Sequence, residues 1–144
     1  MEGIDALEIH FEGSHQPRPL ADQGRDALMA TLGLAPITYR EPRRTRVRPP
    51  AVNDGQPGWI ASRSLDVHGR PVAWVFTGAP PQPDGSEVFL DDTLAEGSVN
   101  HAQLVAGAAY PLFYDTLFAS LRRVLAAAAV DAKQRQDGLW ASDA

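Results

Sequence analysis

The sequence predicts a single α+β domain, and three observations lead to this fold class. The run from Pro71 to Phe76 is apolar at every position, as in a strand that is covered on both faces. Apolar residues recur at helical spacing over 16–32 and again over 115–136. The expected elements follow the order strand, helix, strands, short helix and long helix, which is typical of an α+β domain.

The first helix is expected over residues 16–32, with Gly33 as its C-terminal cap. Its apolar face comprises Leu20, Ala27, Leu28 and Leu32. Residues 37–40 then predict a short strand. Residues 42–58 are rich in Pro, Arg and Gly, so we expect an exposed loop there.

Residues 59–65 and 71–76 are expected to form strands on either side of a turn at 68–69. A second Pro-rich loop follows over 78–87. Residues 88–90 then predict a short strand or bridge.

Two helices are expected in the C-terminal half. Ser98 can cap a short helix that ends at Gly107. The long helix over 115–136 is closed by Gly138, after which Trp140 can fold back onto the core. The apolar stripe of the long helix comprises Leu117, Leu121, Val124, Leu125, Ala128 and Ala132.

Bulk composition excludes several classes of protein. The 144 residues suffice for one domain, and 44% of them are apolar and 22% charged. No apolar run of about 18 residues occurs, so we expect no membrane partner. Met1–Leu7 has two acids and no base, unlike a signal peptide, which leaves the cytoplasm as a default location. The absence of cysteine excludes disulfides, thiolate metal sites and a cysteine nucleophile.

Charge gives two opposite indications about nucleic acid. The net charge of −5 counts against a strong non-specific binder of nucleic acid. However, five arginines fall within residues 40–48, namely Arg40, Arg43, Arg44, Arg46 and Arg48. Guanidinium groups match phosphate oxygens in bidentate fashion, but the stretch could equally be a solvated loop.

Three segments, in this order, carry a resemblance to one known family. Residues 3–8 read Gly-Ile-Asp-Ala-Leu-Glu, and residues 66–70 read Asp-Val-His-Gly-Arg. Residues 98–110 contain Ser-Val-Asn and then Gly-Ala-Ala-Tyr, and Gly-Leu-Trp follows at 138–140. The set resembles the thermonuclease-like (staphylococcal-nuclease-type) family, which carries Gly-Ile-Asp-Thr-Pro-Glu, Asp-x-Tyr-Gly-Arg, Val-Asn-x-x-Leu-Val-x-x-Gly-x-Ala and a final Gly/Asn-x-Trp.

The resemblance implies an OB-fold, a five-stranded Greek-key barrel, here flanked by three helices. It covers residues 1–144 as one domain, with inserted loops at 42–58 and 78–87. The family places three strands, a metal-binding aspartate and an arginine ahead of the segment that contains Asp5. We therefore expect a barrel that is incomplete at the N-terminus, with an open edge that a second copy could occupy by dimerisation or strand exchange.

The resemblance also implies a calcium-dependent nuclease that hydrolyses phosphodiester bonds of DNA or RNA, with activity that the missing upstream residues could abolish. Asp5 and the backbone carbonyl of Ala6 would bind Ca²⁺, which prefers oxygen ligands. Glu8 would position or deprotonate the attacking water, and Arg70 would clamp the phosphate. Arg70 has another reading, an ion pair with Asp66.

Three further residues are substrate-binding candidates by the same resemblance. His68 stands where the family has a tyrosine that touches a phosphate, although it could be an ordinary turn residue. Phe113 and Tyr114 lie near base-flanking tyrosines of the family, and core packing is the competing role. A zinc site at His10 and His15 fits no usual ligand spacing. The alternative to an enzyme is a non-catalytic OB-fold module that binds nucleic acid or protein.

Overall fold

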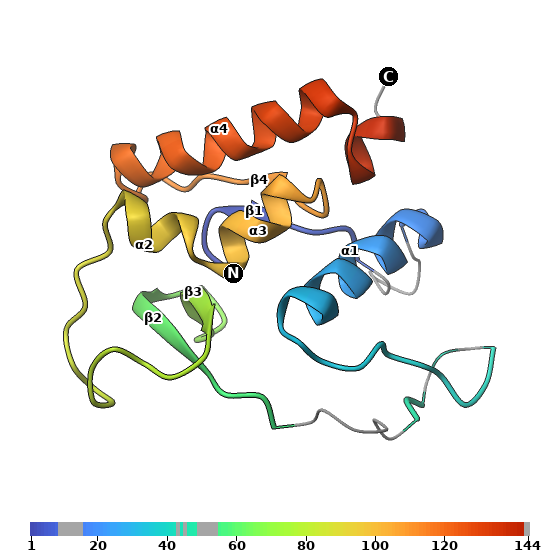
Figure 1. Cartoon of the computed structure of the whole chain (residues 1–144), viewed down its shortest axis with the longest axis horizontal. Coiled ribbons are helices and arrows are strands. Elements are labelled where there is room, and N and C mark those ends of the chain that lie inside the picture. The colour runs from blue at the N-terminus through green and yellow to red at the C-terminus, as the bar shows by residue number, and fades with distance from the viewer. Residues whose placement is uncertain (9–15, 43, 45, 49–54, 143–144) are drawn as a thin grey trace.

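Mixed helices and strands form the part of the chain that the computed structural model describes, which comprises residues 1–8, 16–42, 44, 46–48 and 55–142 (Figure 1). The helices are α1 (Arg18–Thr31), α2 (Asp92–Glu96), α3 (Val99–Val105), α4 (Ala119–Arg135) and the short 3-10 helix η1 (Gly138–Ser142). The strands are β1 (Ile4–Asp5), β2 (Gly58–Leu65), β3 (Pro71–Thr77) and β4 (Tyr110–Pro111). The predicted α+β class is confirmed.

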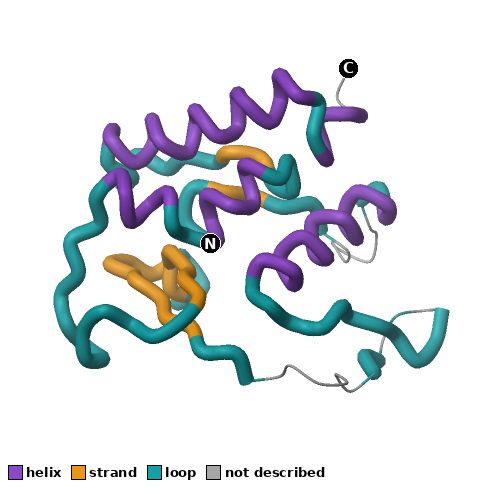
Figure 2. Tube along the Cα trace, viewed as in Figure 1, coloured by secondary structure: helices purple, strands orange, loops and turns teal. Residues whose placement is uncertain are grey.

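The strands form two separate antiparallel pairs (Figure 2). In the first, β1 pairs with β4, and Asp5 lies opposite Tyr110. In the second, β2 pairs with β3, and the register shifts between Ser62 and Ser64. Among the described residues the two pairs do not join into a closed barrel, and no further strand lies along β2.

Helix α4 covers the core along most of its length (Figure 1). The predicted stripe is correct: all its members are buried except Val124, which is partly buried against the core. The helix begins at Ala119, later than the expected 115, because Phe118 has the extended backbone of an N-cap (ψ 144°). Leu117 is buried from the segment that precedes the helix.

Three other expectations about elements need correction. A fourth α-helix, α2, was not predicted; it begins where the Asp91 carboxylate accepts a 2.8 Å hydrogen bond from the Leu94 N–H. Residues 88–90 form no strand. The expected strand at 37–40 is a single bridge between Tyr39 and Val47. By contrast, β2, β3 and the turn between them lie where the sequence predicts.

The C-terminus folds back as expected. The Leu139 N–H donates a 2.8 Å hydrogen bond to the Gly107 carbonyl, which fixes η1 against the end of α3. Gly107 has φ +60°, and a Cβ there would lie 2.3 Å from the Asp137 carbonyl oxygen, so only glycine fits. Trp140 then meets the Tyr110 ring edge-on, with the ring centroids 5.0 Å apart.

Asn100 is fully buried near the start of α3 and joins three segments through its side-chain amide. Its Nδ2 donates to the carbonyls of Glu2 (2.8 Å) and Ala73 (3.1 Å). Its Oδ1 accepts from the Val75 N–H at 3.0 Å. The Glu2 N–H also donates directly to the Ala73 carbonyl (2.8 Å). One side chain therefore holds the N-terminal segment, β3 and α3 together.

Replacing Asn100 with alanine should destabilise the fold by about 3 kcal/mol. Three hydrogen bonds at about 1 kcal/mol each are lost, and their backbone partners are left without them in the interior. Urea denaturation followed by circular dichroism measures the change. Gln134→Ala, an exposed amide on α4, is the control and should change stability by less than about 0.5 kcal/mol. Equal effects from the two substitutions would contradict the role given to Asn100.

Candidate functional site

The turn between β2 and β3 holds Arg70 in a defined position. The Asp66 carboxylate accepts hydrogen bonds from the N–H groups of His68 (2.8 Å) and Arg70 (2.9 Å) through Oδ1. Its Oδ2 accepts from Arg70 Nε at 2.6 Å. Gly69 takes φ +76°, which the turn requires. The ion pair with Asp66 that was the alternative reading of Arg70 is therefore formed.

This arrangement lowers the pKa of the Asp66 carboxyl from 3.8 to about 2. The largest cause is the hydrogen bond from the Arg70 backbone N–H, and the Arg70 guanidinium and the His68 N–H add to it. The Arg70 side chain remains 74% exposed. It therefore stays accessible to an anion from solvent while Asp66 orients it.

The predicted metal-binding segment is exposed. Asp5, Ala6 and Glu8 all lie on the surface. Asp5 belongs to β1 beside Tyr110. The Glu8 backbone is tied to Gln16, whose Oε1 accepts from the Glu8 N–H at 2.6 Å and whose N–H donates to the Glu8 carbonyl at 3.2 Å. Over the described part of the chain, no three His, Asp or Glu side chains gather as a metal site would require.

No hydrogen bond or ion pair in the described structure joins Arg70 to Asp5 or Glu8. The structure thus brings Arg70 together with Asp66, and places Asp5 next to β4, without direct contact between the two groups. His10 and His15, considered for zinc, lie outside the described residues.

The three substrate-binding candidates differ in their surroundings. His68 is exposed in the turn, where its backbone is used by Asp66. Phe113 is partly buried and packs against the hydrophobic core, which is the competing role considered for it. Tyr114 is 59% exposed. Of the two aromatic residues, Tyr114 is thus the one that can reach a ligand in solvent.

A second charged group was missed by sequence reasoning. The Glu2 side chain is only 5% exposed and lies 3.9 Å from the guanidinium of Arg63. The same guanidinium donates to the Thr116 carbonyl and lies 4.4 Å above the Phe118 ring. Burial of Glu2 has no signal in the sequence, because glutamate side chains are almost always exposed.

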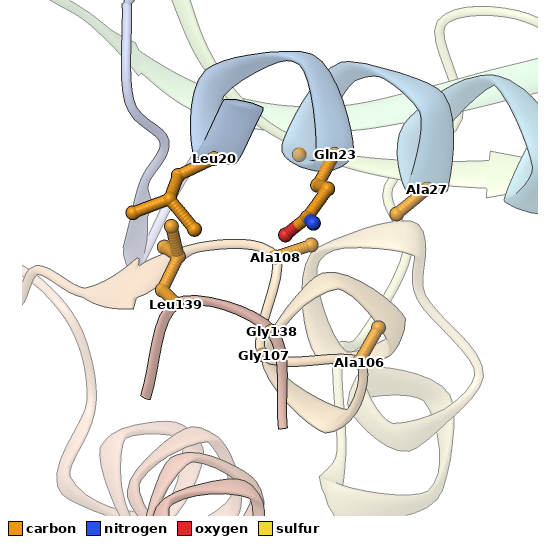
Figure 3. A pocket seen from close by; sticks show the side chains of 9 residues that line it. Leu20, Gln23, Ala27, Ala106, Gly107, Ala108, Gly138 and Leu139 are labelled. Atoms are coloured by element: carbon orange, nitrogen blue, oxygen red, sulfur yellow. The ribbon is translucent and has the colours of Figure 1, made fainter. Parts of the chain in front are cut away.

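Two grooves on the described part of the chain contain neither an acid nor a base. The larger, of about 360 Å³, lies between α1 and the turns at Gly107 and Gly138. Leu20 and Gln23 of α1 point into it toward Ala108 and Leu139 (Figure 3). The other, of about 290 Å³, lies between residues 32–34 and the strands β2 and β3. Neither lining includes an ionisable side chain, so neither offers a general acid, a general base or a charged metal ligand.

None of the helices in the described ranges is both long and apolar enough to cross a membrane. Comparison of the chain with protein-family models, with curated proteins and with solved structures finds no match.

The role of Arg70 in the turn can be tested by titration. The Asp66 carboxyl should titrate at a pKa of about 2 in the folded protein. Arg70→Ala should raise this pKa only part of the way toward 3.8, because the backbone N–H groups at positions 68 and 70 still donate to the carboxylate. A lowered pKa means that Asp66 stabilises the fold fully above about pH 3.8 and loses this contribution as the pH falls toward about 2. NMR of the carboxyl carbon measures both values. An unchanged pKa in the variant would show that the guanidinium has no influence on Asp66.

Proposed function

We propose that this chain is a thermonuclease-like domain that hydrolyses phosphodiester bonds of DNA or RNA with calcium, on an OB-type barrel. The observation that supports it best is the set of hydrogen bonds made by Asn100. The amide connects the segment that leads to Asp5 with the strand that follows Arg70, and Asn100 itself belongs to the third motif of the resemblance.

The short stretches of chain between this junction and the two site residues limit how far Asp5 and Arg70 can lie from it. Asp5 lies three residues after Glu2, and Arg70 lies three residues before Ala73. The Glu2 N–H and the Ala73 carbonyl are bonded directly at 2.8 Å. Three residues span at most about 10 Å, so Asp5 and Arg70 each lie within about 10 Å of this junction and at most about 20 Å from each other. A bound nucleic-acid strand could therefore contact both, although they do not touch each other.

Each residue has a role that fits its chemistry. The exposed guanidinium of Arg70 would bind a non-bridging phosphate oxygen and stabilise the charge that develops during attack. Glu8, exposed on the same segment as Asp5, would orient the attacking water and take its proton. His68, next to Arg70 in the turn, and Tyr114 would contact the phosphate and a base.

The described residues fit calcium in kind but supply few ligands. Asp5 and the Ala6 carbonyl are oxygen donors, as Ca²⁺ prefers, whereas the ion takes six to eight. Calcium bound there would neutralise phosphate charge. Because the two donors are exposed and the described residues contain no group of three metal-binding side chains, we expect weak calcium binding that substrate phosphate strengthens.

A second function is favoured by two observations. Arg70 is already engaged by Asp66, and no three-carboxylate group is present among the described residues. A module that binds nucleic acid or protein without cleaving it needs neither a free guanidinium nor a metal site. The two functions differ in one outcome: a nuclease cuts the nucleic acid when calcium is present, whereas a binding module leaves it intact.

A cleavage assay separates them. Single-stranded DNA and RNA with a fluorescent end label should be cut in the presence of calcium and stay intact with chelator. Arg70→Ala should slow cleavage by about 10²-fold or more, because it removes the donor for the developing charge. Arg123→Ala, an exposed arginine on α4 with the same loss of charge, should leave the rate unchanged. Cleavage that persists in chelator, or that Arg70→Ala does not slow, would refute the calcium mechanism.

Glu8→Gln provides an independent test of the proposed base. The substitution keeps the size of the side chain and removes its ability to take a proton, so the cleavage rate should fall by about 10²-fold or more. Substrate affinity, measured in chelator, should change little. Glu87→Gln is the control, because Glu87 is also an exposed glutamate and lies in the loop after β3. A full rate in Glu8→Gln would exclude Glu8 as the base.

A further inference from the structure

Charge is unevenly distributed along this acidic chain. Residues 17–48 contain seven of the 13 basic residues but only three of the 18 acidic ones. This stretch therefore carries a net charge of +4, whereas the remainder of the chain carries −9. A positive region on a negative protein indicates a specific surface for anions rather than general attraction to them.

Residues 38–42, 44 and 46–48 form a narrow hairpin, here named the arginine arm. Its two sides are joined by the bridge between Tyr39 and Val47. The Arg48 N–H donates to the Thr38 carbonyl (2.8 Å), and the Arg40 N–H donates to the Arg46 carbonyl (2.9 Å). The backbone of the arm is thereby held in an antiparallel register.

Arg44 and Tyr39 fasten this arm to α1. Arg44 Nη1 contacts both carboxylate oxygens of Asp22 at 2.6 and 2.7 Å. The bond from Arg44 is the largest cause of the lowered pKa of the Asp22 carboxyl. Two guanidinium groups also lie over the Tyr39 ring, with Arg44 5.5 Å and Arg25 5.8 Å from its centroid. These contacts use Arg25 and Arg44 for attachment.

The attachment to α1 does not use the other three described arginines of the arm, Arg40, Arg46 and Arg48. Side chains alternate between the two faces of an extended pair, and directly opposite residues share a face. Tyr39 and Val47 share one face, and Tyr39 contacts Arg25 of α1 there, so the alternation assigns Arg40, Arg46 and Arg48 to the other face. All three are exposed, and the described ion pairs include none of them. Arg48 Nε also donates to the Tyr39 carbonyl at 3.0 Å, which orients its guanidinium group.

The placement of Arg40 directly opposite Arg46 costs stability. Like charges on opposite positions of an antiparallel pair repel each other. Glu41, next to Arg40 in the sequence, accepts the Arg46 backbone N–H through Oε1 at 2.7 Å. A bound polyanion would remove the repulsion, and guanidinium groups in a row match successive phosphates.

We propose that the arginine arm binds the phosphodiester backbone of a nucleic-acid strand through Arg40, Arg46 and Arg48. The choice of nucleic acid among polyanions rests on the proposed nuclease function, whereas the positive face is independent of Asp5, Glu8 and Arg70. The arm lies in a loop outside the segments that resemble thermonuclease-like proteins. It would hold the strand by its charge without reading its sequence.

The test is binding of a fluorescent oligothymidine to the whole chain in chelator, so that cleavage plays no part. Three phosphate contacts on a single strand contribute a slope of about −2 to log K against log salt. Affinity should therefore fall by about 20-fold on this account between about 50 and about 200 mM NaCl. R40Q/R46Q/R48Q should lose this part of the salt dependence. R123Q/K133Q/R135Q on α4 removes the same charge and should keep it.

The proposal would be overturned if the two triple variants bound oligothymidine with the same affinity and the same salt dependence, whether both kept the wild-type values or both lost them. Preference of the wild type for a sulfated polysaccharide or an acidic peptide over the oligonucleotide would overturn the assignment to nucleic acid. If the arm variant does not fold, NMR of the arginine Nε–Hε groups in the wild type decides: signals of Arg40, Arg46 and Arg48 should shift with oligothymidine. Binding that survives in Arg70→Ala while cleavage is lost separates the arm from the catalytic proposal.

Discussion

The buried amide of Asn100 is the contact on which the arrangement of the chain depends. Two of its hydrogen bonds reach the backbone carbonyls of Glu2 and Ala73, which are 98 and 27 residues away in the sequence. The segments that contain these carbonyls are not paired in one sheet. In a domain whose described sheets have only two strands each, backbone pairing alone cannot hold the parts together. A fully satisfied side-chain amide in the interior supplies the specificity that a larger sheet would otherwise provide.

The elements that the sequence predicts correctly are those with a strong local pattern. Helix α4 has an apolar stripe over its whole length, and the β2–β3 hairpin has an apolar strand next to a Gly-containing turn. Helix α2 is only five residues long, too short for an apolar period, and depends on the cap from Asp91. The separation of the strands into two pairs could not be predicted, because it depends on contacts between β1 and β4, more than 100 residues apart.

In the candidate site, too, features set by a local sequence pattern could be predicted, and features set by tertiary contacts could not. Both readings of Arg70 rested on a short motif, and the pairing with Asp66 could be predicted because the two residues are four apart across a turn. The surroundings of Phe113 and Tyr114 could not, since neighbouring residues in an irregular segment differ in burial for reasons of tertiary packing. The arginine cluster was visible as composition. Only the register of the arm shows which of its arginines hold the protein together and which remain available.

The bonds from Asn100 have a consequence for how the chain is made. During synthesis the segment around Glu2 leaves the ribosome before its partners on β3 and α3, which follow about 70 to 100 residues later. At about 5–20 residues per second, Glu2 waits about 5–20 s for Asn100 to be translated. The residues around Glu2 are thus among the last to dock, and during this interval they are open to chaperones and proteases.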